Sequence, residues 1–104
     1  MSELELVDFE DLGLLDGGDL RAVLEQVAPA QALDALIGTS AGQRNRLLSK
    51  LPSASAARLE AQIVTHGPVT FEAVHSAQRA VVDALRRLSR AGQIAFDDPA
   101  DMVA

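Results

Sequence analysis

The sequence lacks cysteine, tryptophan and tyrosine, and its aromatic residues are three phenylalanines. Without cysteine the chain forms no disulfide bond and performs no thiolate chemistry, which fits the reducing environment of the cytoplasm. No apolar stretch approaches the roughly 20 uninterrupted residues of a membrane-spanning helix. The acidic start, Met1 to Glu5, lacks the basic and then apolar pattern of a secretory signal. These absences predict a cytoplasmic protein without membrane insertion.

Charge is distributed unevenly along the 104 residues. The net charge is −6, yet residues 1–19 hold seven acidic residues and no basic one. Residues 20–96 carry all nine basic residues against five acidic ones, a net charge of +4. A chain of this length is expected to form one domain. We predict an acidic lead over residues 1–15, a helical domain over 16–96 and an acidic tail over 97–104.

The composition and the breakers predict an all-α fold. Alanine and leucine dominate the apolar residues, which favours helix, and no segment alternates apolar and polar residues with the period of a strand. Glycine and proline divide the chain into five or six short helices, expected to form a compact, armadillo-like bundle with a long final helix. The expected helices run from Asp16 to about Val27, Pro29 to Gly38, Ser40 to Leu51, Ser53 to Gly67 and Thr70 to about residue 91.

Local signals support these bounds. Ser40 and Gln43 have the spacing of a capping box, Ser53 and Thr70 are placed to begin helices, and Gly92 follows the last helix as a natural C′ residue. The inward strip of the long helix is expected to comprise Phe71, Val74, Gln78, Val81, Leu85 and Leu88.

The sequence offers no pattern typical of catalysis or of cofactor binding. His66 and His75 lie on different expected elements, with no cluster of further ligands to complete a metal site. A capping role is the favoured interpretation of His66, and a boundary position that of His75. No glycine-rich phosphate-binding motif occurs, and the paired carboxylates lie in the acidic ends, where nothing would tune them for acid catalysis. We predict no catalytic, cofactor-binding or metal-binding residue, and no enzymatic activity.

A basic group on two neighbouring helices raises the possibility of nucleic-acid binding. Arg44, Arg46, Lys50 and Arg58 imitate a helix-turn-helix arrangement. The negative net charge and the few aromatic residues argue against it, because phosphate contacts need a concentrated positive field. A solvated basic helix face is the favoured interpretation, and no nucleic-acid partner is predicted.

Several motifs in register give the sequence a family resemblance. Near the end it contains Gly67-Pro68-Val69, then Ala77-Gln78 and Arg86-Arg87-Leu88, and near the start Phe9-Glu10-Asp11-Leu12 and Ala35-Leu36-Ile37-Gly38. Together they resemble the C-terminal domain family of the flagellar motor switch protein FliG over about residues 6 to 96.

The resemblance implies an all-helical domain at the rim of the cytoplasmic rotor ring, at the cytoplasmic face of the inner membrane. It implies protein partners, namely rotor or switch components and the cytoplasmic loop of the stator, and no catalysis. It further implies a ridge of charged residues on one helix that transmits torque through electrostatic contacts. Such exposed ion pairs are individually weak, so several must act together.

The chain departs from the family at this ridge. The five charged positions are filled by Ile37, Ala54, Ala61, Gln62 and Thr70. Glu60 reverses a position that the family often fills with arginine, and Arg58 lies one turn beyond Ala54. At the expected hinge over residues 6–9, only Phe9 is retained. The sequence therefore resembles a divergent member of the family, either a short paralogue or a piece of a longer protein.

Two functions remain open from the sequence. The first is a non-enzymatic interaction module in the rotor and switch complex of the flagellar motor. The second is a FliG-like adaptor or scaffold that has lost the torque-generating charges and binds another helical protein away from the stator. The predicted interaction residues are Phe9, Leu12, Ile37, Ala54, Arg58, Glu60, Ala61, Gln62 and Thr70, with Gly67 and Pro68 as a structural turn.

Overall fold

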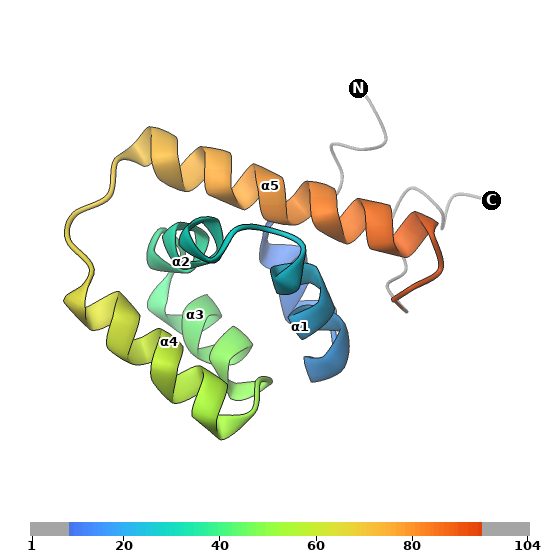
Figure 1. Ribbon diagram of the computed structural model, residues 1–104, viewed down its shortest axis with the longest axis horizontal. Helices are drawn as coiled ribbons and strands as arrows, with labels where there is room; N and C mark the ends of the chain where they lie inside the picture. Colours follow the sequence, from blue (N-terminus) through green and yellow to red (C-terminus); the bar gives the residue numbers. More distant parts are fainter. Residues whose placement is uncertain (1–8, 95–104) are drawn as a thin grey trace.

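The protein is all-helical in the computed structural model, which describes residues 9–94 (Figure 1). Within these residues there is no strand. The expected acidic tail over 97–104 lies outside the described part. The elements are the 3₁₀ helix η2 (Phe9–Leu14) and the α-helices α1 (Gly17–Glu25), α2 (Pro29–Ile37), α3 (Ala41–Ser49), α4 (Ser53–Thr65) and α5 (Phe71–Arg90).

Side-chain caps begin three of these helices at predicted positions. The carboxylate of Asp16 accepts from the backbone N–H of Asp19 at 2.8 Å, and the hydroxyls of Ser40 and Thr70 act likewise for α3 and α5. At the far end of α5, Gly92 has a φ of +72°, the left-handed conformation that glycine adopts without strain. The caps therefore confirm the start and stop signals of the long helix.

Helix α4 begins at the predicted residue, Ser53, but no side chain caps it. Ser53 is its first helical residue, and the N-cap is Pro52, which has an extended ψ of 143° and makes no side-chain cap bond. The capping box at α3 is also incomplete, because the Gln43 side chain donates to the Glu10 carbonyl oxygen at 3.2 Å instead.

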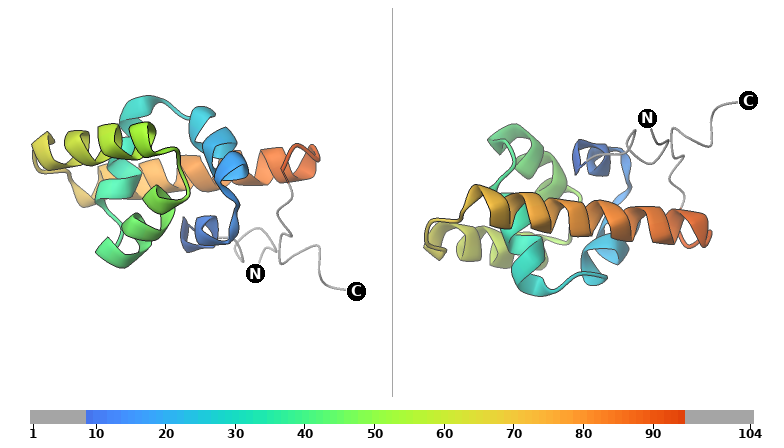
Figure 2. Two further views of the ribbon diagram at one scale, coloured as in Figure 1. Left: turned by 90° about the horizontal axis from the view of Figure 1, so that it is seen from below. Right: turned by 90° about the horizontal axis from the view of Figure 1, so that it is seen from above.

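Helix α5 is the longest element, and α1 and α2 pack along it (Figures 1 and 2). Its inward face confirms most of the predicted strip, since Val81, Leu85 and Leu88 are buried and the Gln78 side chain donates to the Ala35 carbonyl oxygen at 3.1 Å. Phe71 was expected inward but is 84% exposed. The first turn of α5 extends beyond α2 in Figure 1, and the Phe71 ring stacks on His75 of the same helix.

Residues at the start of the described chain belong to the core. Phe9, Leu12 and Leu15 are buried in one cluster with residues of α1, α2, α3 and α5. The predicted division placed these residues in a lead ending at residue 15, outside the domain. Their apolar side chains at helical spacing instead fold against α3 and α5, so the packed domain includes residues 9–15.

Helix α4 lies at the edge of the bundle. It packs on α2 and α3, and α2 lies between it and α5 in Figure 1. None of its residues is buried, and Leu59 and Ile63 are half-buried against the core. Much of the α4 surface is therefore exposed to solvent.

Candidate protein-interaction surface

The predicted interaction residues of α4 lie on two different sides of the helix. Ala54, Arg58 and Ala61 are spaced by four and three residues, so they share one face, with Gln62 at its margin. All four are exposed, and Ala54, Arg58 and Ala61 lie on the side of the helix opposite Ile63. We name Ala54, Arg58, Ala61 and Gln62 the outer face of α4. It carries a single charge, on Arg58.

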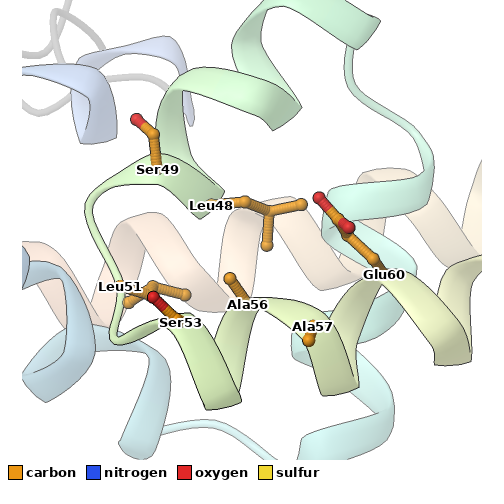
Figure 3. A pocket seen from close by; sticks show the side chains of 7 residues that line it. All are labelled: Leu48, Ser49, Leu51, Ser53, Ala56, Ala57 and Glu60. Atoms are coloured by element: carbon orange, nitrogen blue, oxygen red, sulfur yellow. The ribbon is translucent and has the colours of Figure 1, made fainter.

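Glu60 lies about 120° around the helix from Ala54, at 3.6 residues per turn. This position brings it to a groove between α3 and α4, a hollow of about 310 Å³ (Figure 3). We name this hollow the α3–α4 groove; its lining residues are Leu48, Ser49, Leu51, Ser53, Ala56, Ala57 and Glu60.

Ile37 and Thr70 lie apart from α4, at a corner where the end of α2 meets the start of α5. Ile37 is half-buried, and the Thr70 hydroxyl accepts from the Ala73 backbone N–H at 3.0 Å. Thr70 borders a second hollow, of about 380 Å³. Its lining residues are Gly38, Val69, Thr70, Phe71, Val74, His75 and Gln78. The sequence predicted that these residues form one ridge. In the structure they lie in three places: the outer face of α4, the α3–α4 groove, and the corner between α2 and α5.

Two of the predicted interaction residues are buried and are not available to a partner. Phe9 is 6% exposed and Leu12 is fully buried. Both side chains pack inside the domain, where a partner cannot reach them without unfolding η2. Their contribution is to the stability of the core.

Gly67 and Pro68 lie in the connection between α4 and α5. Residues 66–70 form neither helix nor a tight turn, so Gly67 and Pro68 lie in an open link and not in the predicted turn.

His66 begins this link as the C-cap of α4, and its Nε2 lies 3.6 Å from the Asp34 carboxylate. His75 is exposed and stacks on Phe71. No cluster of three or more metal-ligating side chains occurs in residues 9–94.

The basic group on α3 has structural roles that sequence reasoning missed. The Arg44 guanidinium donates to the carbonyl oxygens of Leu36, Ile37 and Thr39 at 3.0 to 3.2 Å, closing the C-terminus of α2. The Leu36 carbonyl oxygen also accepts from the Thr39 backbone N–H at 3.4 Å. Carbonyls in the last turn of a helix lack their usual donors, and positive charge is favourable at a helix C-terminus. The available signal was a cation a few residues after the helix stop at Gly38.

Lys50 binds the backbone at the end of η2. Its ammonium group donates to the carbonyl oxygens of Gly13 and Leu15, the latter at 2.7 Å. Arg44 and Lys50 are thus engaged inside the domain, and the helix-turn-helix interpretation loses two of its four cations.

Replacing Arg44 with alanine is expected to lower the free energy of unfolding by about 1–3 kcal/mol, because carbonyl groups at the end of α2 lose their donors. The matched control is Arg58→Ala on the outer face of α4, with an expected change within about 0.5 kcal/mol. Urea denaturation followed by circular dichroism measures both. Equal losses in the two variants would contradict the capping role of Arg44.

The fold and the surface define a small all-helical domain with an exposed helix at its edge. Residues 3–96 match the model of the FliG C-terminal domain, and the chain belongs to this family. The flagellar motor switch protein FliG of Thermotoga maritima is 31% identical over 86 residues, which cover 83% of this chain and 26% of the relative. The chain thus spans about a quarter of that relative's length. In the described part of the chain, no helix is long and apolar enough to cross a membrane.

Proposed function

We propose that the chain is a non-enzymatic protein-interaction module in the rotor and switch complex of the bacterial flagellar motor, at the cytoplasmic face of the inner membrane. The observation that carries the proposal is the match to the FliG C-terminal domain over residues 3–96, nearly the whole chain. The relative from Thermotoga maritima is named a flagellar motor switch protein, which supports the same role. Its partners would be rotor and switch proteins.

Deleting the gene is expected to abolish swimming or directional switching, and expression of the unchanged chain to restore it. Tracking of single cells by microscopy measures both properties. A deletion strain that swims and switches normally would contradict the rotor assignment.

A second candidate function is an adaptor or scaffold that binds a helical protein without touching a stator. The specific observation in its favour is the outer face of α4, which is exposed and carries only the charge of Arg58. A torque-transmitting contact needs several charges acting together, since each exposed pair is worth about 0–1 kcal/mol.

Restoring charge in the same complementation strain separates the two functions. Ile37→Lys together with Ala54→Arg is expected to change swimming speed only where this surface faces a stator loop. An unchanged speed in a strain that depends on the chain would favour the adaptor function. Ala30→Lys, at an exposed position at the opposite end of α2 from Ile37, is the matched control.

A further inference from the structure

The α3–α4 groove combines an apolar base with one acidic end. Leu48 is buried, Leu51 and Ala56 are half-buried, and Ala57 forms an exposed part of the lining. Figure 3 shows Ser49 and Ser53 at one end of the groove and Glu60 at the other. The lining therefore offers apolar contact along its length and a negative charge at one end.

The structure directs the nearby cations away from this groove. Arg44 caps the end of α2, Lys50 binds the carbonyls of η2, and the Arg46 side chain lies close to Gly13. Arg58 lies about 160° around α4 from Glu60, on the outer face. Glu60 is consequently the only charged residue among those that line the groove.

Val64 continues the same side of α4 beyond Glu60. It lies one turn further along the helix, and its side chain is 82% exposed. A rod-shaped ligand lying along α4 would meet Ala57, Glu60 and Val64 in succession. This surface therefore places apolar side chains on both sides of one carboxylate. It would suit an amphipathic helix that has a lysine or arginine next to its apolar stripe.

We propose that the α3–α4 groove binds an amphipathic helix of a partner protein, with apolar side chains over Leu51 and Ala56 and a lysine or arginine at Glu60. Recognition of this kind places the apolar face of a helix in a groove between helices. The negative charge of Glu60 favours a partner with a positive side chain at that end of the groove, because a negative side chain there would be repelled. The proposal goes beyond the rotor assignment and is tested on the isolated chain, so either can fail without the other.

The test uses two synthetic helical peptides of leucine and alanine that differ only in carrying lysine or glutamate beside the apolar stripe. NMR titration of the full chain is expected to shift the amides of Leu48, Ser49 and Ala57. The lysine peptide is expected to bind about two- to thirtyfold more tightly than the glutamate peptide, the range for one exposed ion pair gained and one repulsion avoided. Glu60→Lys is expected to reverse that preference.

Matched variants separate the groove from general charge attraction. Glu72→Lys makes the same charge change at an exposed position on α5 and is expected to retain the preference for the lysine peptide. Ala57→Phe fills the groove and is expected to abolish binding, whereas Gln62→Phe, at an exposed position about 160° around α4 from Glu60, is expected to leave it unchanged. The proposal is overturned if neither peptide binds, if the shifts lie outside the groove, or if Glu60→Lys and Glu72→Lys act alike.

Discussion

Replacing Leu85 with alanine is expected to lower the free energy of unfolding by about 2–5 kcal/mol, because the change removes a buried side chain and leaves a cavity. Leu85 is fully buried in the middle of α5, within the core cluster shared by η2, α1, α2 and α3. A domain of this size has a total stability of only about 5–15 kcal/mol. The loss would therefore be a large fraction of the whole.

Leu14→Ala provides the matched control, since Leu14 at the end of η2 is 75% exposed. The same atoms are removed, but little apolar surface returns to water, so the expected loss is within about 0.5 kcal/mol. Thermal and urea denaturation of both variants measure the difference. Comparable losses would show that Leu85 is not packed as described.

Replacing Gly17 with alanine is expected to destabilise the domain by about 1–3 kcal/mol through overpacking. A β-carbon at Gly17 would lie 2.1 Å from the backbone carbonyl oxygen of Lys50. A carbonyl group at the end of α3 cannot rotate aside as a long side chain can, so α1 and α3 must separate.

The adjacent Gly18→Ala is the control for this prediction. The nearest atom to a β-carbon there is a carboxylate oxygen of Asp16 at 3.6 Å, an ordinary contact. Alanine favours helix over glycine by up to about 1 kcal/mol, so Gly18→Ala is expected to be neutral or stabilising. Melting temperatures that move in the same direction in both variants would contradict the close approach at Gly17.

Local patterns predicted the helices because caps and breakers act over a few residues. Asp16, Ser40 and Thr70 cap helices in the structure, and the confirmed fold class and family follow from these signals and the motifs in register. Phe71 shows the limit of periodicity, which assigns a face to the helix but not the neighbour that covers it. The exposed first turn of α5 depends on where α2 ends in space.

The candidate surface was less predictable than the fold. Phe9 and Leu12 were grouped with an acidic lead because charge dominated the composition there, although their spacing already indicated a buried face. Glu60 was identified as a reversed charge, but its place in the α3–α4 groove depends on the packing of α3 against α4. Arg44 was missed as a cap, since a long side chain reaching another helix leaves no periodic signal.

Lys50 is the only lysine of the chain, and its ammonium group is held by the backbone of η2. The side chain is half-buried, and the ammonium group must give up these hydrogen bonds before a reagent can acylate it. The rate of acylation at Lys50 therefore reports how often its side chain is released from the backbone of η2 in the native state. This single lysine thus serves as a natural probe of local opening between η2 and α3.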